Sequence, residues 1–120
     1  MEEVSDRSLG DLTDRLRAAL GNPREGLPKD VFLLVSAITP LINVDLLIQN
    51  DDGETLLTWR EDEFYGPGWH VPGGIVRFKE KFSTRIDEVA RSELGTRVTA
   101  GTMPLLMNEV MTPHRRASIW

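Results

Sequence analysis

Glu93 is the residue whose position most strongly suggests chemistry. Residues 79–94 have the pattern of an amphipathic helix, with an apolar stripe made of Phe82, Ile86, Val89 and Ala90. Glu93 falls inside that stripe, where a carboxylate is costly unless it is paired or bound to a metal ion. It also falls in the last helical turn, where the helix dipole disfavours a negative charge. This placement predicts a cation beside Glu93, and the alternative is a frayed helix end that leaves it in water.

The Pro72-Gly73-Gly74 turn precedes this helix and offers a second kind of oxygen ligand. Glycine lets a backbone carbonyl approach a ligand that a Cβ would keep away. Mg²⁺ takes carboxylate and carbonyl oxygens and keeps several waters for the phosphates of a substrate. A glycine carbonyl and Glu93 together therefore predict half of a magnesium site, although a Gly-Gly pair alone is most often only a turn.

These residues stand in an order that resembles the Nudix box, G-x5-E-x7-R-E-U-x-E-E-x-G-U, where U is aliphatic. The agreement comes from Gly74, Glu80 and the run Glu93-Leu94-Gly95. The other box positions carry Glu88, Val89, Ala90, Ser92 and Thr96. This pattern of losses is similar to the GDP-mannose mannosyl hydrolase branch of the Nudix superfamily, which keeps a single Glu before the Leu-Gly.

The resemblance extends upstream and covers about residues 27–101. Residues 39–45 are similar to the TPL-x-x-x-D strand of that branch, residues 53–60 to its G-E-x-L-L-x-x-R strand, and residues 69–74 to its W-x-V-P-G-G turn. The resemblance implies an α/β (α+β) fold, a Nudix-like αβα sandwich with a mixed β-sheet. It also implies a homodimer, because the branch dimerises through its N-terminal segment.

The resemblance assigns roles to individual residues. The carbonyl of Gly73 or Gly74 and the carboxylate of Glu93 would hold Mg²⁺, with Mn²⁺ as a substitute. Glu80 would stand near the metal, or else serve only as an acidic residue at a helix start. Arg60 would pair with the diphosphate, and Asp45 would bind the sugar. Without the resemblance, Arg60 and Asp45 read equally well as solvated strand residues.

The general base is the least defined part of the expected site. In the branch, a His of a late loop activates the water and a third metal ligand comes from the same region. The chain has two histidines, of which His114 lies in a predicted loop and His70 lies beside the glycine turn. His114 is the better candidate for the base, because strand alternation could direct His70 away from the site.

The predicted elements divide the chain in two. Residues 1–26 form a helical extension and linker, with a helix from Asp6 or Ser8 to about Leu20. Residues 27–120 form the Nudix-like domain, whose C-terminal part would be incomplete. We expect a helix over 28–38, strands over 42–49, 55–60 and 71–76, a loop over 61–69, the helix over 79–94, and strands over 97–100 and 104–111.

Composition limits the classes of partner. The 120 residues include no Cys, which excludes disulfides, Cys-zinc sites and thiol catalysis. The net charge of −5 disfavours duplex nucleic acid, although a few Arg residues or a metal could still bind a small anion. The longest apolar run is five residues, Val31 to Val35, so no membrane span is predicted, and we expect a cytoplasmic protein.

The sequence thus predicts an Mg²⁺-dependent hydrolase of a nucleoside diphosphate sugar. In the mannosyl hydrolase type, water attacks the anomeric carbon and releases the intact nucleoside diphosphate. Two alternatives stay open at this point. One is a pyrophosphatase that cleaves the same substrate class at phosphorus, and the other is a catalytically impaired Nudix-fold module that only binds a nucleotide sugar.

Overall fold

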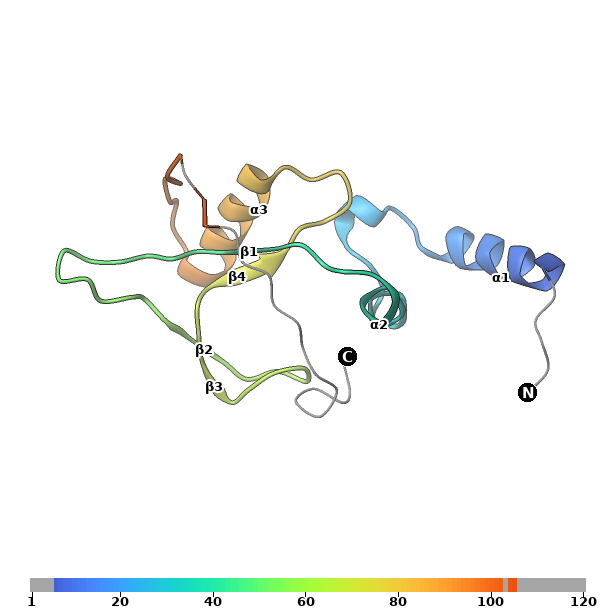
Figure 1. The fold of residues 1–120 in the computed structure, drawn as a ribbon, viewed down its shortest axis with the longest axis horizontal. Coiled ribbons are helices and arrows are strands. Elements are labelled where there is room, and N and C mark those ends of the chain that lie inside the picture. The colour runs from blue at the N-terminus through green and yellow to red at the C-terminus, as the bar shows by residue number, and fades with distance from the viewer. Residues whose placement is uncertain (1–5, 103, 106–120) are drawn as a thin grey trace.

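The computed structural model describes residues 6–102, 104 and 105, and these form an α+β fold, as the sequence predicts (Figure 1). Two helices and a 3-10 turn precede four consecutive short strands, and a third helix with its π-helical continuation follows them. In chain order the elements are α1 (Asp6–Ala19), the 3-10 turn η1 (Pro23–Glu25), α2 (Lys29–Ile38), β1 (Asn43–Asp45), β2 (Thr58–Arg60), β3 (Gly68–His70), β4 (Gly73–Ile75), α3 (Phe82–Val89) and the π-helical segment η2 (Ala90–Leu94).

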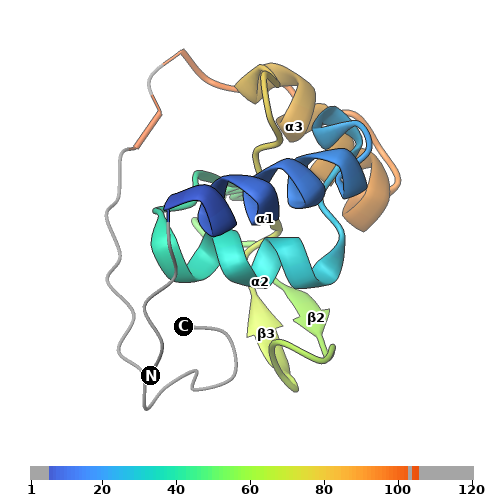
Figure 2. The same ribbon diagram turned by 90° about the vertical axis from the view of Figure 1, so that its right-hand side faces the viewer.

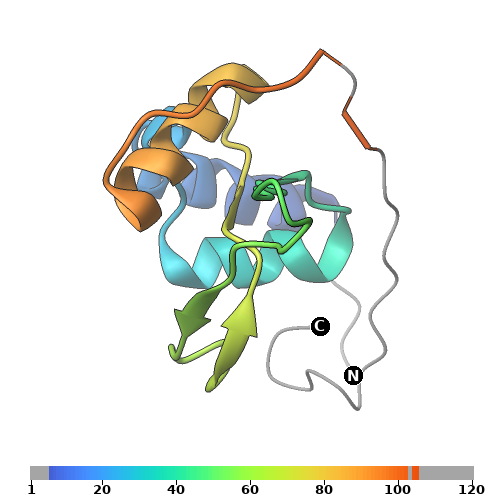
Figure 3. The same cartoon turned by 90° about the vertical axis from the view of Figure 1, so that its left-hand side faces the viewer.

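The four strands pair two by two, and both pairs are antiparallel. β1 pairs with β4, and Asp45 lies opposite Gly73. β2 pairs with β3, and Thr58 lies opposite His70. The expected mixed sheet is therefore not formed within the described residues, where the two pairs remain separate sheets. The first two residues of β3 fall in the segment 61–69 that the sequence predicts to be a loop. The pairing of β3 with β2 makes a hairpin that projects from the rest of the molecule (Figures 2 and 3).

The core lies where α3 covers one face of the β1–β4 pair. Its buried residues are Leu46, Val89 and Ala90, and Ile86 and Val44 pack against them. The alternation of β1 explains this arrangement, since Val44 faces the helix while Asn43 and Asp45 face the other side. The core is small, so the position of α3 depends strongly on how closely it can approach the strands.

Gly74 permits that close approach. A Cβ built on Gly74 would lie 2.9 Å from Cγ2 of Val89, closer than side-chain carbon atoms come to one another. The missing side chain lets α3 rest directly on β4, which is the reason for a glycine at this position.

The helix that carries Glu93 starts later than the sequence predicts, while its end at Leu94 before Gly95 agrees with the prediction. It begins at Phe82 rather than at residue 79, because Lys79 has a positive φ of 55° and Lys81 is extended. Phe82, predicted to lie in the apolar stripe, is 57% exposed. From Ala90 onward the α-helix widens into the π-helical η2, which ends at Gly95 with a φ of 66°.

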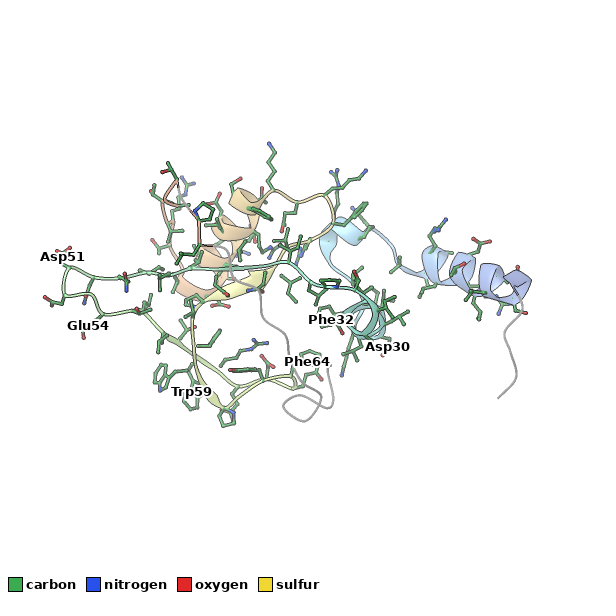
Figure 4. All side chains as sticks on the ribbon, viewed as in Figure 1. Asp30, Phe32, Asp51, Glu54, Trp59 and Phe64 are labelled. Carbon is green, nitrogen blue, oxygen red and sulfur yellow. The ribbon has the colours of Figure 1, made fainter. Side chains whose placement is uncertain are left out.

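The N-terminal helices agree with their predicted bounds. Gly21, with a φ of 68°, follows α1, and Pro28 caps α2. α1 lies at one end of the molecule (Figure 1). α2 contacts the loop after β2, where the Phe32 and Phe64 ring centroids are 6.3 Å apart and Lys29 Nζ lies 2.8 Å from Glu63 Oε2 (Figure 4).

Two further sequence predictions concern the end of the chain. Residues 97–100, predicted to be a strand, have no regular secondary structure, so that prediction is wrong. The predicted strand 104–111 lies mostly outside the described residues.

Over the part of the chain that the structure describes, no helix is both long enough and apolar enough to cross a membrane.

The contact at Gly74 can be tested by adding one methyl group. We expect Gly74→Ala to lower the free energy of unfolding by about 1–3 kcal/mol, because the new Cβ would push α3 away from β4. Urea unfolding followed by circular dichroism measures the change. Gly10→Ala is the control, since a Cβ there meets nothing within 4 Å in a helix interior and should be neutral or stabilising. A Gly74→Ala protein as stable as the parent would contradict this packing.

Candidate active site

A pocket of about 360 Å³ opens between the two strand pairs and the end of η2. It brings together four residues that the sequence predicts for the site, and each comes from a different element. Asp45 comes from β1, Arg60 from β2, Gly73 from β4 and Glu93 from η2. The remaining lining residues are Asn43, Asp62, His70, Val71, Gly74 and Ile75.

Strand alternation directs two charged or titratable side chains of the hairpin toward the pocket. Arg60 and His70 occupy the half-buried face of β2 and β3, whereas Trp59 and Trp69 occupy the exposed face. The two indole rings meet edge to face with centroids 5.3 Å apart (Trp59 is labelled in Figure 4). One hairpin therefore has a polar face toward the pocket and an aromatic face toward solvent.

Glu93 reaches the pocket from the π-helical segment. An α-helical wheel, which assumes a rotation of about 100° per residue, places Glu93 in the apolar stripe. A π-helix rotates less per residue, so the α-helical wheel gives the wrong direction for residues after Val89. The Glu93 side chain is 30% exposed, and its Oε2 lies 4.0 Å from Nε2 of His70. The carboxylate thus faces a polar pocket rather than the core, and single-turn π segments of this kind are frequent at functional sites.

The register of β1 and β4 decides between the two glycine carbonyls. Leu46 N–H donates to the Pro72 carbonyl, and Val76 N–H donates to the Ile42 carbonyl. Because backbone groups alternate in direction along a strand, residues 72, 74 and 76 turn their hydrogen-bonding groups toward β1. The Gly73 carbonyl consequently points away from that ladder and is the one available to a ligand.

Gly73 also makes room for Asp45. A Cβ on Gly73 would overlap Oδ1 of Asp45 directly opposite it in the sheet. That oxygen also accepts a hydrogen bond of 2.7 Å from Asn43 Nδ2, two residues earlier on the same strand face. Asp45 is therefore held against the glycine at the wall of the pocket.

Arg60 is oriented by the loop that follows it. Its Nε donates to Oδ2 of Asp62 at 2.6 Å, and its guanidinium carbon lies 5.1 Å from the centroid of the Tyr65 ring. Asp62 Oδ1 accepts from the backbone N–H groups of Phe64 and Tyr65, both at 2.8 Å. The hydrogen bond from Arg60 is the main cause that lowers the pKa of Asp62. Arg60 has five N–H donors, so this contact leaves others for a ligand.

Glu80 lies outside the pocket, in an ion pair. Arg85 Nε and Nη2 donate to its two oxygens at 2.7 and 2.8 Å, and both side chains are only 12% exposed. The hydrogen bonds from Arg85 are the main cause that lowers the pKa of Glu80 to about 2. Arg85 thus partners Glu80 although the box Arg position carries Glu88, which itself pairs with Arg91 at 2.8 Å.

Two residues predicted for the site are not among the lining residues of the pocket. Glu80 is not brought to Gly73 and Glu93. His114 lies outside the described residues.

The pocket carries an excess of negative charge. Its lining includes the carboxylates of Asp45, Asp62 and Glu93 against the single guanidinium of Arg60. In residues 6–102, 104 and 105, no three His, Asp or Glu side chains form a cluster able to hold a metal ion. A divalent cation would therefore rely on a mixed set of donors, and Glu93 with the Gly73 carbonyl fits the oxygen preference of Mg²⁺.

Three polar lining residues, Asn43, Asp62 and His70, were not predicted from the sequence as part of the site. Asn43 could have been found from its alternation with Asp45, which sets both on one face of β1. Asp62 could have been found as a turn residue, because an Asp accepting backbone N–H groups a few residues on is a common loop start. His70 required the unpredicted strand β3, whose pairing with β2 sets its direction.

The chain matches no known protein-family model. It is similar to the low-salt glycan biosynthesis protein Agl8 of Haloferax volcanii, with 39% identity over 77 residues. The alignment covers 64% of this chain and 49% of Agl8, so the matched part spans about half the length of that relative.

The Glu80–Arg85 pair makes stability depend on pH. The pKa of Glu80 falls from an ordinary 4.5 to about 2 on folding, so the ionised carboxylate stabilises the fold at pH values above 4.5. We expect Glu80→Gln to lower the urea midpoint at pH 7, and the difference from the parent to shrink as the pH falls from about 4.5 toward 2. Glu88→Gln removes an exposed pair and should change the midpoint less. A difference that is independent of pH would contradict this role.

Proposed function

We propose that the chain forms the catalytic part of a divalent-cation-dependent Nudix hydrolase of nucleoside diphosphate sugars, of the GDP-mannose mannosyl hydrolase type. The observation that carries the proposal is the shared pocket of Asp45, Arg60, Gly73 and Glu93. These four residues match separate motifs of the branch and converge from four elements. The similarity to a protein of glycan biosynthesis supports a sugar-related role for this chain.

The charge of the pocket supports the need for a cation. A diphosphate entering among three carboxylates would be repelled, and Arg60 alone does not balance them. Glu93 and the Gly73 carbonyl would hold Mg²⁺ or Mn²⁺. The positive charge of the ion would offset the excess of negative charge, so that the pocket could bind an anionic ligand. When bound, the ion supplies stabilisation of the charge that develops on the diphosphate leaving group.

The protein side chains would orient the substrate. Arg60 would use its remaining N–H donors to fix the diphosphate, while Asp62 holds the guanidinium in place. Asp45, fixed by Asn43, would accept hydrogen bonds from sugar hydroxyl groups. Holding the diphosphate and the sugar would fix the anomeric carbon, which joins them, for attack by water.

The buried end of α3 supports attack at carbon rather than at phosphorus. Val89 and Ala90 stand where the Nudix box has a carboxylate and an aliphatic residue, and they are 3% and 0% exposed. Both are part of the core, so neither position contributes to a set of several metal ions. A site with one carboxylate from this helix fits a single ion that assists a leaving group.

The role of Glu93 is tested with its amide. We expect Glu93→Gln to lower the rate of hydrolysis of a nucleoside diphosphate sugar in the presence of Mg²⁺ by about 10²-fold or more, because a neutral amide holds the ion weakly. Glu88→Gln, an exposed change on the same helix, is the matched control and should keep the parent rate. Equal turnover by Glu93→Gln and the parent protein would remove Glu93 from the metal site.

The products distinguish the three activities. Attack at the anomeric carbon gives the nucleoside diphosphate and the free, inverted sugar, which chromatography and proton NMR identify. Nucleoside monophosphate with sugar phosphate would instead establish a pyrophosphatase. Binding of the nucleotide sugar without turnover in the presence of Mg²⁺ would establish a binding module.

A further inference from the structure

Among the described side chains that line the pocket, His70 carries two ring nitrogens that the proposed function does not use. It is 19% exposed, and it lies on the face of β3 that is turned toward Glu93. The backbone of β2 holds its ring on one side, and the other side faces the pocket. The chemistry open to it follows from its two ring nitrogens, which have different partners.

The contact at Nδ1 defines the tautomer. Nδ1 lies 2.9 Å from the carbonyl oxygen of Thr58, directly across the β2–β3 pair. A carbonyl oxygen only accepts hydrogen bonds, so this contact favours the tautomer with the proton on Nδ1, and the Thr58 hydroxyl at 3.5 Å is the longer contact. In the neutral imidazole the lone pair is then on Nε2, the nitrogen that faces Oε2 of Glu93.

This arrangement is the one that metal-binding histidines adopt. A ligating His almost always donates its other ring N–H to a carbonyl or carboxylate, which fixes the ring and the tautomer. The Thr58 carbonyl supplies that contact for His70. The strand pairing therefore presents Nε2 ready to bind a cation.

The separation of Nε2 and Oε2 permits one ion to contact both. Metal–nitrogen and metal–oxygen bonds of about 2.1 Å allow two ligands of one ion to be at most about 4.2 Å apart. The observed distance is 4.0 Å. A small side-chain rotation of Glu93, which is 30% exposed, would shorten it to the spacing of neighbouring ligands.

We propose that His70 Nε2 is a third protein ligand of the cation held by Glu93 and Gly73, and that the pocket consequently binds divalent transition metals more tightly than Mg²⁺. The inference rests on the metal site of the proposed function. Imidazole nitrogen suits Co²⁺, Ni²⁺ and Zn²⁺, whereas Mg²⁺ prefers an all-oxygen set. The donor set of one nitrogen, one carboxylate and one carbonyl thus selects the metal.

Two substitutions separate the functions of the two ring nitrogens. His70→Asn keeps an N–H donor near the Nδ1 position and removes Nε2, so it preserves the contact with Thr58 and removes the ligand. His70→Gln places an amide near the Nε2 position and removes the Nδ1 donor. Calorimetric titration of the protein with Co²⁺ and with Mg²⁺ gives the affinities.

We expect His70→Asn to lower the affinity for Co²⁺ at least about tenfold and the affinity for Mg²⁺ less than about twofold. Glu93→Gln should weaken both metals. Equal Co²⁺ affinity of His70→Asn and the parent would overturn the role of His70, provided that Glu93→Gln still weakens binding. If Glu93→Gln binds both metals as the parent does, the metal site of the proposed function itself fails.

A measurement on the unaltered chain avoids any effect of substitution on folding. The sequence has two histidines, so long-range proton–nitrogen NMR of the imidazoles gives two sets of signals, which His114→Asn assigns. Without metal, we expect the His70 signals of the Nδ1–H tautomer. One equivalent of Zn²⁺ should move Nε2 of His70 and leave Nδ1 protonated. An unchanged Nε2 signal at saturating Zn²⁺ would overturn the proposal.

Discussion

The contact between Gly74 and Val89 is the constraint on which the site depends. Helix α3 reaches β4 because Gly74 has no side chain, and a Cβ there would lie 2.9 Å from Val89. With a core of only three buried hydrophobic residues among those described, no large packing surface could otherwise fix the helix. The adjacent Gly73 faces the opposite side of the sheet and admits Asp45. Two consecutive glycines thus determine how closely α3 approaches β4 and how Asp45 lies at the wall of the pocket.

The change from α- to π-helix after Val89 sets the direction of Glu93. The buried residues Val89 and Ala90 anchor the junction, and the wider turn that follows carries Glu93 toward His70. Gly95, with its positive φ, ends the segment immediately afterwards. The backbone at Glu93 therefore lies between the buried residues Val89 and Ala90 and the turn at Gly95, which sets the side of the helix from which its carboxylate projects.

The α+β class and the approximate bounds of α1 and α2 could be predicted from the sequence, because the glycine and proline at the helix ends are local signals. The four residues singled out from the sequence as site candidates line one pocket, and their roles there stay predictions. The direction of His70 and the strand β3 could not be predicted in this way, because they depend on pairing between segments ten residues apart. The π-helical end of α3 was missed for a related reason, since a wheel assumes a constant turn per residue.

The edge-to-face pair of Trp59 and Trp69 has an experimental consequence. The same two strands carry Arg60 and His70 on the opposite side, so a change in the twist of β2 against β3 when the pocket fills would alter the angle between the indoles, now 79°. Coupled indole transitions give circular dichroism bands in the near ultraviolet whose sign and size depend on that angle. The protein therefore contains its own optical reporter of pocket geometry, at a place where no dye or label needs to be attached.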